Sequence, residues 1–293
     1  MIQKVLVIGG TGMLGSPVVW RLHADDFTVR VMTHSPEKAK KIIGNEMEVV
    51  VGDVTDPASL SQPISDCDAI YLNLSAKMDP CKYESVERRG AANVARVAAE
   101  HNVRRIAMIS ELGVDSPDSP FPHLAAKAGA EQALKDSGVS YTILRCCWFM
   151  ESLPLFVQEN KAYVIGRQPH LLSWLATSDY AGMVSNALRS DAAANRVFHV
   201  RGIEKMTIRE ALTIFCGIVY PKVKIATIPL WMLSLGAKLG GRREMKGFVN
   251  FMKYSDRHME PEVSDDSDRI LGPALTTIAD WAEEYKKDML AEK

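Results

Sequence analysis

Short apolar runs alternate with amphipathic stretches along the first half of the chain. Residues 5–8 (Val-Leu-Val-Ile) are wholly apolar, which is typical of a strand buried on both faces of a parallel sheet. The further predicted strands are 27–32, 48–52, 69–74, 105–110 and 141–145. Helical patterns fall between the strands, at 16–22, 36–43, 83–101 and 124–137. This alternation predicts an α/β fold with a doubly wound parallel sheet of the Rossmann type.

After residue 150 the alternation of strand and helix patterns becomes less regular. Shorter elements there are separated by Pro154, Pro169, Pro221, Pro229, Pro261 and Pro273. We therefore expect a first domain over 1–150 and a smaller C-terminal region over 151–293, with the chain crossing back to the sheet near 172–200. The longest apolar stretch, 225–239, contains a proline and a lysine and is shorter than the roughly 18 residues of a membrane span. It predicts an amphipathic element over a pocket.

A glycine-rich segment, Gly9-Gly10-Thr11-Gly12-Met13-Leu14-Gly15, lies between the first predicted strand and helix. Glycine lets the chain turn tightly and brings bare N–H groups against a pyrophosphate, while the positive helix N-terminus faces the same anion. The Gly-x-x-Gly-x-x-Gly spacing differs by one residue from the usual fingerprint, and a plain glycine-rich turn is the alternative. The flanking strand and helix favour dinucleotide binding, with 1–150 holding NAD(P) and 151–293 holding the substrate. The expected contacts are Gly9, Thr11, Gly12, Met13, Leu14 and Gly15.

Composition and charge narrow the function further. The 293-residue chain has a net charge of −1, so nothing in the overall charge argues for nucleic acid or an anionic membrane as a partner. The five cysteines form no Cys-x-x-Cys pair and no Cys/His spacing suited to a metal, so we expect no metal site. The first residues enter a strand directly and show no export signal, which favours a cytoplasmic protein.

Several segments resemble the atypical short-chain dehydrogenase/reductases, and among them the NmrA-like and epimerase-like branch. They are 9–12 (Gly-Gly-Thr-Gly), 52–56 (Gly-Asp-Val-Thr-Asp), 141–145 (Tyr-Thr-Ile-Leu-Arg), 148–151, 176–181 and 272–281. The resemblance covers nearly the whole chain and implies a Rossmann fold, an NAD(P) cofactor and a small-molecule substrate. Helices of this fold commonly pair across a two-fold axis, so we expect a monomer or a homodimer. The reaction stays open, because the branch mixes reductases with redox-sensing regulators and assembly factors.

The end of the second predicted strand bears on which dinucleotide binds. NAD-binding proteins place a carboxylate there, about 20 residues after the glycines, to hold the ribose hydroxyls. Here that position carries Thr33-His34-Ser35 and, one turn on, Lys38. Family members that prefer NADP usually carry an arginine at the position of His34, and His34, Ser35 and Lys38 can hold a 2′-phosphate instead. We therefore favour NADP(H) over NAD(H), with a loop turn and a solvated lysine as the alternative interpretation.

Further cofactor contacts are expected where other strands end. The resemblance assigns Asp53 to the adenine amine, beside Val54, although a helix cap or turn residue would look the same. The fourth strand ends in Asn73-Leu74-Ser75, which should pass under the nicotinamide ribose. After the sixth strand, Cys146-Cys147-Trp148 should line the pocket beside the nicotinamide, with Cys147 as wall rather than catalytic thiol. The aromatic and Met residues that follow predict an apolar substrate region, with a lid formed by Trp231, Met232 and Leu235.

The chemistry of short-chain reductases comes from a serine and a Tyr-x-x-x-Lys pair. Here the fifth strand ends at Ser110, and His123 and Lys127 follow with the family spacing but with histidine in the tyrosine position. The i,i+4 spacing puts both side chains on one helix face. A neutral imidazole, with an unperturbed pKa of about 6.5, can transfer a proton, and we expect the neighbouring Lys127 cation to lower that pKa. Alternatively, His123 is a cap or packing residue.

These residues support two classes of function. The first is an NADP(H)-dependent oxidoreductase of a small apolar carbonyl, quinone or enone, in which His123 supplies the proton, Lys127 holds the ribose and Ser110 binds the substrate oxygen. The second is a non-catalytic sensor of NADP(H) or an assembly factor, because loss of the tyrosine often marks such proteins in this branch. A nucleotide-sugar epimerase is a third hypothesis, weakened by the lack of an arginine cluster suited to a sugar diphosphate.

Overall fold

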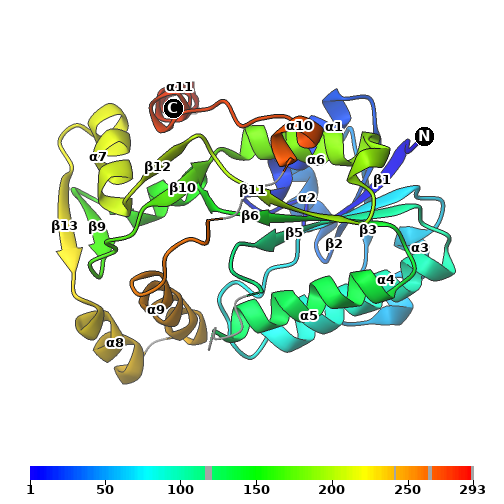
Figure 1. Ribbon diagram of the computed structural model, residues 1–293, viewed down its shortest axis with the longest axis horizontal. Helices are drawn as coiled ribbons and strands as arrows, with labels where there is room; N and C mark the ends of the chain where they lie inside the picture. The colour runs from blue at the N-terminus through cyan, green and yellow to red at the C-terminus, as the bar shows by residue number, and fades with distance from the viewer. Residues whose placement is uncertain (116–120, 241, 263–265, 292–293) are drawn as a thin grey trace.

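A seven-stranded, wholly parallel sheet organises the protein (Figure 1). The computed structural model describes residues 1–115, 121–240, 242–262 and 266–291. The strand order is β11-β6-β5-β4-β1-β2-β3, so the sheet is wound outward in both directions from β1 and β4. The strands are β1 (Lys4–Ile8), β2 (Thr28–Thr33), β3 (Glu48–Val51), β4 (Ala69–Leu72), β5 (Arg105–Glu111), β6 (Tyr141–Cys146) and β11 (Arg196–Val200). The predicted doubly wound α/β fold is confirmed.

The first six strands agree with their predicted ranges to within a residue or two at each end. Their apolar runs can be recognised in the sequence because these strands are covered by helices on both faces of the sheet. β11 was not predicted. It forms the edge of the sheet, where Phe198 and Val200 are buried while Arg196 and His199 are only partly buried, so the apolar run is broken.

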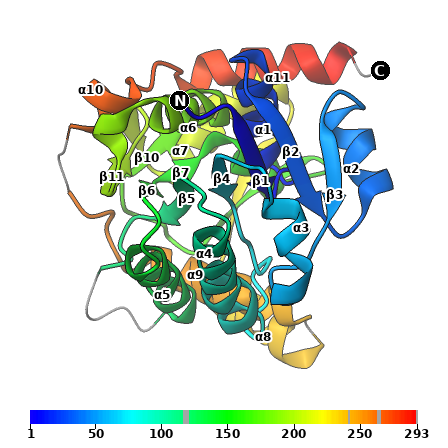
Figure 2. The same cartoon turned by 90° about the vertical axis from the view of Figure 1, so that its right-hand side faces the viewer.

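Helices cover both faces of the sheet, as the second view shows (Figure 2). One apolar core joins the sheet to α1, α2 and α6, and a second joins it to α3, α4 and α5. These helices are α1 (Gly15–Ala24), α2 (Pro36–Ile43), α3 (Ser61–Ile64), α4 (Arg89–Glu100), α5 (Pro122–Asp136) and α6 (Thr177–Arg189), with short 3-10 turns η1 (Pro57–Ser59) and η4 (Asp191–Ala193). The four predicted helices are present.

The predicted helix 83–101 differs in one respect. Its first part, η2 (Tyr83–Arg88), is a π-helix that leads directly into α4. π-Helical turns change which side chains face inward, and they recur at functional sites. In η2 the inward residues are Tyr83 and Glu87, so a carboxylate enters the interior at this point.

A smaller region packs beside the main sheet around its own apolar core, which includes Trp174, Phe215 and Trp281. It has two three-stranded sheets, ordered β12-β10-β7 and β13-β9-β8. Its strands are β7 (Trp148–Phe149), β8 (Val157–Gln158), β9 (Lys161–Ile165), β10 (Leu172–Leu175), β12 (Glu204–Met206) and β13 (Lys224–Ile228). Its helices are η3 (Met150–Phe156), α7 (Ile208–Val219), α8 (Leu230–Leu239), α9 (Arg243–Ser255) and α11 (Ile278–Ala291), while α10 (Ser267–Leu271) packs on α6.

Three of the family-like segments meet at one buried carboxyl group. Glu151 Oε1 accepts hydrogen bonds from the Thr177 N–H and hydroxyl at 3.0 and 2.7 Å, and from Trp281 Nε1 at 3.0 Å. Burial raises the pKa of Glu151. This contact ties the start of α6 and the start of α11 to η3, and so fixes the smaller region against the sheet. Within the described residues, no helix combines the length and the apolarity that crossing a membrane requires.

A buried ion pair anchors the ends of β5 and β6. Arg145 donates to Glu131 through Nε at 3.0 Å and Nη2 at 2.8 Å, and through Nη1 to Asp115 at 2.6 Å. Glu131 is 1% exposed and Arg145 7%. The same Glu131 accepts the Ser110 hydroxyl at 2.6 Å. Charges this deeply buried are tolerated only because each has its partner.

We therefore expect Arg145→Met to lower the free energy of unfolding by about 3–5 kcal/mol, because it removes the buried cation of Glu131 and leaves only the more exposed Lys135, 3.5 Å away. The matched control is Asp115→Asn, which removes the third, largely exposed partner and should cost about 0–1 kcal/mol. Equilibrium unfolding in urea measures both. Equal losses in the two variants would contradict this account.

Candidate cofactor and substrate site

The glycine-rich loop between β1 and α1 owes its glycines to different causes. Gly9 has φ +84°, and a Cβ there would lie 2.0 Å from the Asn73 carbonyl oxygen. A Cβ at Gly15 would lie 2.1 Å from the Gly9 carbonyl oxygen. At Gly12, by contrast, a Cβ would meet only that same oxygen, at an ordinary 3.5 Å. The protein itself therefore requires glycine at 9 and 15, whereas Gly12 leaves room on the open side of the loop.

The same loop presents unused hydrogen-bond donors. The N–H groups of Gly12, Gly15 and Ser16 donate to carbonyl oxygens within the loop. Within the described residues, those of Thr11, Met13 and Leu14 donate to no protein acceptor. The N-terminus of α1 likewise has no side-chain cap. Free amides at a helix N-terminus form an anion site, so this loop fits the pyrophosphate of a dinucleotide.

The ends of β2 and β3 lie next to the loop, because these strands follow β1 in the sheet. Ser35 precedes α2 and its hydroxyl caps no helical N–H, while its own N–H donates to Thr33 Oγ1 at 3.1 Å. His34 is exposed, with Nδ1 3.9 Å from Asp53 Oδ2, and Lys38 is exposed on α2. The structure thus brings Thr33, His34, Ser35, Lys38 and Asp53 to one corner.

Asp53 and Val54 differ in what they offer a ligand. Burial would raise the pKa of Asp53, but hydrogen bonds from the Thr55 N–H and hydroxyl, both 2.7 Å, outweigh it and lower that pKa. The Asp53 carboxylate is 42% exposed, with one oxygen turned toward His34. Val54 instead packs its side chain in the core, and its carbonyl accepts the Asn93 amide at 2.9 Å. Val54 can therefore contact a ligand only through its backbone or by van der Waals contact.

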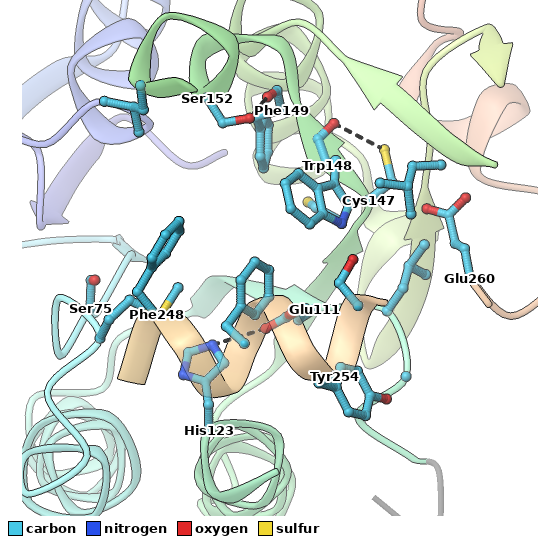
Figure 3. A pocket seen from close by; sticks show the side chains of 18 of the residues that line it. Ser75, Glu111, His123, Cys147, Trp148, Phe149, Ser152, Phe248, Tyr254 and Glu260 are labelled. Atoms are coloured by element: carbon cyan, nitrogen blue, oxygen red, sulfur yellow. Dashed lines mark hydrogen bonds and ion pairs between the residues drawn. The ribbon is translucent and has the colours of Figure 1, made fainter. Parts of the chain in front are cut away.

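A cavity of about 560 Å³ extends from the loop into the smaller region (Figure 3). Eleven of the predicted site residues line it: Met13, Leu14, Asn73, Leu74, Ser75, Ser110, His123, Lys127, Cys146, Cys147 and Trp148. The others lie outside its wall, at the ends of β1, β2 and β3: Gly9, Thr11, Gly12, Gly15, Thr33, His34, Ser35, Lys38, Asp53 and Val54. Figure 3 shows His123 and Glu111 on one side of the cavity and Trp148 and Phe149 across from them.

Lys127 and His123 lie side by side at the start of α5, as the i,i+4 spacing predicts. Lys127 Nζ donates to the Leu74 carbonyl at 3.0 Å and lies 3.3 Å from Glu87 Oε2. His123 lies between two carboxylates, with Nε2 2.9 Å from Glu111 Oε2 and Nδ1 3.3 Å from Glu87 Oε2. The Tyr83 ring packs against the imidazole, with centroids 5.1 Å apart.

Burial lowers the pKa of His123, and the Lys127 cation lowers it too, as expected. The charges of Glu111 and Glu87 and the hydrogen bond to Glu111 outweigh both. The pKa of His123 is therefore raised, which favours the imidazolium form. Tyr83 does not replace the missing catalytic tyrosine, because burial, aided by Glu87, raises its pKa to about 12, and it does not line the cavity.

Ser110 differs from its predicted role, whereas the two cysteines line the cavity as predicted. The Ser110 hydroxyl hydrogen is engaged by Glu131, and the residue is 4% exposed, so this contact does not support a role in binding the substrate oxygen. Burial raises the pKa values of Cys146 and Cys147. Thiols are nucleophilic as thiolates, so these two belong to the wall of the cavity.

The substrate half of the cavity is mostly aromatic and aliphatic. Trp148 packs against Phe251 with centroids 5.3 Å apart, and Tyr254 stacks on His258 at 4.1 Å. Glu260 adds a polar group, which accepts the Ser173 N–H and hydroxyl at 3.0 and 2.6 Å.

The predicted lid is wrong in its residues. α8 contributes Leu233, whereas Trp231, Met232 and Leu235 point outward, and α9 supplies Met245, Phe248, Phe251 and Tyr254.

The sequence analysis assigned no role to Glu87, to Glu111 or to the α9 side chains. Glu111 had a usable signal, since it directly follows Ser110 at the sheet edge where ligands bind in open α/β sheets. Glu87 had none, because its inward direction depends on the π-helical turn. Among the described residues, no group of three or more His, Cys, Asp or Glu side chains could hold a metal ion.

Comparison with known proteins agrees with this geometry. The profile of the NAD(P)H-binding family matches residues 9–168. A (4-alkanoyl-5-oxo-2,5-dihydrofuran-3-yl)methyl phosphate reductase from Streptomyces griseus is 30% identical over 209 residues, which is 70% of this chain and 70% of that protein. The photosystem II assembly factor Ycf39 from Trieres chinensis is 24% identical over 244 residues, which is 82% of this chain and 76% of that protein.

The fold also matches solved structures. Citrobacter sp. triphenylmethane reductase, complexed with NADP(H), superimposes with a TM-score of 0.77 at 17% identity, over 97% of this chain and 99% of that chain. At this identity the likeness concerns the fold. Together with the family profile, which spans more than half of the chain, it confirms the resemblance seen in the sequence. The chain belongs to the NAD(P)H-binding family.

Proposed function

We propose that this protein is an NADP(H)-dependent reductase of a small, largely apolar carbonyl, quinone or enone. One observation carries the proposal: a single cavity runs from the dinucleotide loop to an aromatic chamber, and Lys127 and His123 lie in its wall. The division of labour follows, with residues 1–150 holding the cofactor and 151–293 supplying most of the substrate chamber. The S. griseus relative, whose name is that of a reductase, agrees with this reaction class.

The preference for NADP(H) rests on the corner formed by His34, Ser35 and Lys38. The Ser35 hydroxyl caps no helical N–H, and the two basic side chains are exposed and free to move toward a 2′-phosphate. No carboxylate follows directly at the end of β2 to hold a ribose 2′-hydroxyl. Asp53 opposes the preference through its charge, but the family resemblance assigns this residue to the adenine amine.

When bound, a reduced nicotinamide supplies a hydride, and residues of the protein hold and transfer the proton. Lys127 uses Nζ to reach the Leu74 carbonyl and Glu87, and a lysine ammonium has three donors, so one is left for the ribose. His123, whose raised pKa favours the protonated form, donates its Nε2 proton to the oxygen of the reduced substrate. Glu111 orients the imidazole until the substrate oxygen takes its place at Nε2.

The charges of the cavity favour a neutral substrate. Among the described residues that line it, Lys127 is the single Lys or Arg, and it already faces Glu87. Glu111 and Glu260 would repel an anion. Trp148, Phe248 and Phe251 supply a wide apolar surface instead. A nucleotide sugar, with its two phosphates, finds no arginine among the described lining residues and only a lysine that already faces Glu87, which argues against the epimerase hypothesis.

A second function is favoured by a specific comparison. The Ycf39 relative is named an assembly factor, and this chain lacks the catalytic tyrosine of the wider family. In that case the protein would bind NADP(H) as a sensor or assembly factor, and His123 would be a packing residue between Tyr83 and Glu87. Turnover of any neutral quinone or enone at a rate on the order of 1 per second or more would decide for the enzyme.

We expect His123→Ala to lower kcat about 100- to 10,000-fold, because it removes the proton donor. The affinity for NADPH should stay nearly unchanged, since the imidazole lies beyond the ribose-binding Lys127. Steady-state oxidation of NADPH in the presence of a small quinone measures kcat, and calorimetric titration measures affinity. Turnover that is unchanged in the variant would refute the role of His123.

The pH dependence provides the control for this assignment. A donor must be protonated, so kcat/KM should fall as pH rises through the raised pKa of His123. Glu111→Gln removes the main charge that raises this pKa, and should move the fall to lower pH. A structural histidine would leave the profile unmoved. The His123 charge also stabilises the fold, a contribution present at low pH and lost as pH rises through the same raised pKa.

For the cofactor, we expect calorimetric titration to give micromolar affinity for NADPH and much weaker binding of NADH. The double substitution His34→Ala and Lys38→Ala should weaken NADPH binding about tenfold, equal to about 1.4 kcal/mol, and leave NADH binding unchanged. Equal binding of both dinucleotides to the unaltered protein would overturn the NADP(H) preference. Absence of binding by either would overturn the proposed function itself.

Two glycine variants test the loop. Gly12→Ala should weaken NADPH binding about tenfold or more with little effect on stability, because the added methyl group meets space that the pyrophosphate needs. Gly15→Ala should instead lower the free energy of unfolding by about 2 kcal/mol or more, since its methyl group would overlap the Gly9 carbonyl. Thermal unfolding and NADPH titration of both proteins separate the two effects. Similar behaviour of the two variants would contradict this division.

A further inference from the structure

The outer face of α8 carries three large apolar side chains, each of which is half exposed or more. Trp231 is 68% exposed, Met232 50% and Leu235 51%. Positions 231, 232 and 235 fall on one side of a helix, so the three form a continuous stripe. Single exposed apolar residues are ordinary on a protein surface, but a stripe containing a tryptophan is a feature of interaction sites.

α8 lies at the margin of the molecule, at the lower edge in both views (Figures 1 and 2). It follows β13 and leads into α9, against which it packs. A ten-residue helix is about 15 Å long. The stripe is therefore a narrow, protruding apolar edge.

Positive charge gathers at the end of this edge. Arg242, Arg243 and Lys246 are exposed where α9 begins, with Glu244 as the one opposing charge among 242–246. Arg242 lines a surface groove together with Glu244, Met245 and Met232, so one of these cations adjoins the apolar stripe. The overall net charge of −1 conceals this local excess.

We propose that α8 docks this protein on an anionic lipid surface. Trp231, Met232 and Leu235 enter the boundary between headgroups and acyl chains, roughly 5–10 Å deep, as interfacial amphipathic helices do. Arg242, Arg243 and Lys246 lie against the lipid phosphates, where clustered cations are attracted to an anionic leaflet. Tryptophan suits this boundary, because its ring is apolar and its N–H reaches water.

The size of the stripe favours lipid over a protein partner. A stable protein–protein interface takes about 800 Å² from each partner, with some 20–30 residues a side. Three side chains on a short protruding helix offer far less, whereas insertion into a headgroup layer needs only such an edge.

Docking would also bring the substrate cavity to the lipid. Leu233, on the inner side of α8, lines the cavity, and Ile228, Leu233 and Met245 line both the cavity and the surface groove. An apolar substrate dissolved in the bilayer would thus meet the protein beside the helix that covers its chamber. The docking itself does not depend on the proposed reductase activity.

The test is co-sedimentation of the full chain with phosphatidylcholine vesicles, with and without phosphatidylglycerol. We expect binding to vesicles that contain phosphatidylglycerol and little to phosphatidylcholine alone. The substitutions Trp231→Ser with Leu235→Ser should reduce the bound fraction about tenfold, and Arg242→Glu with Arg243→Glu should abolish the preference for phosphatidylglycerol. Trp20→Ser is the matched control, because Trp20 is a 40% exposed tryptophan on α1, and it should bind as the unaltered protein does.

Circular dichroism and NADPH titration show that each variant is folded, which separates lost docking from lost structure. In the unaltered protein, a blue shift of tryptophan emission on adding vesicles, absent in Trp231→Phe, would place Trp231 in the lipid. The proposal is overturned by absence of vesicle binding, by equal binding to both kinds of vesicle, or by a Trp231→Ser, Leu235→Ser protein that binds normally. A protein that docks but reduces no quinone would keep this inference and refute the reductase.

Discussion

The candidate site depends on one buried carboxylate, that of Glu87. Its Oε1 accepts the Ala76 N–H at 2.8 Å, and its Oε2 lies 3.3 Å from both Lys127 Nζ and His123 Nδ1. It thus joins the π-helical turn, the segment after β4 and the start of α5 through polar contacts. With its side chain 1% exposed, the charge has no water to compensate it, so its partners must stay in place.

Charge balance explains the state of His123. Two carboxylates, Glu87 and Glu111, face one lysine, so the cluster is neutral only when the imidazole carries a proton. A phenol in the same place would be neutral and would leave a net negative charge in the wall of the cavity. Histidine in the tyrosine position is thus matched by its surroundings, which makes a chance loss of the tyrosine a poorer account of this site than a change of proton donor.

The sheet and the dinucleotide loop were predictable because their signals are local. Buried strands leave apolar runs, and Gly9 and Gly15 are required by contacts within a few residues or at the adjoining strand end. The rest depends on contacts between distant segments. The sign of the His123 pKa shift needs Glu87 and Glu111, the Ser110 hydroxyl is engaged by a residue 21 positions later, and the lid residues depend on how α8 turns over α9. No periodicity in the chain encodes these pairings.

The two halves of the cavity are therefore under different constraints. The cofactor half is built from the ends of sheet strands, where Gly9, Asn73 and Ser110 follow the paired residues Ile8, Leu72 and Met108 of β1, β4 and β5. The substrate half is built mainly from η3, α8 and α9, which lie outside the main sheet and can change their side chains without disturbing it. This separation agrees with relatives whose names are as different as a reductase and an assembly factor. Membership of the family thus indicates the cofactor, whereas the substrate class has to be inferred from the aromatic chamber of this chain alone.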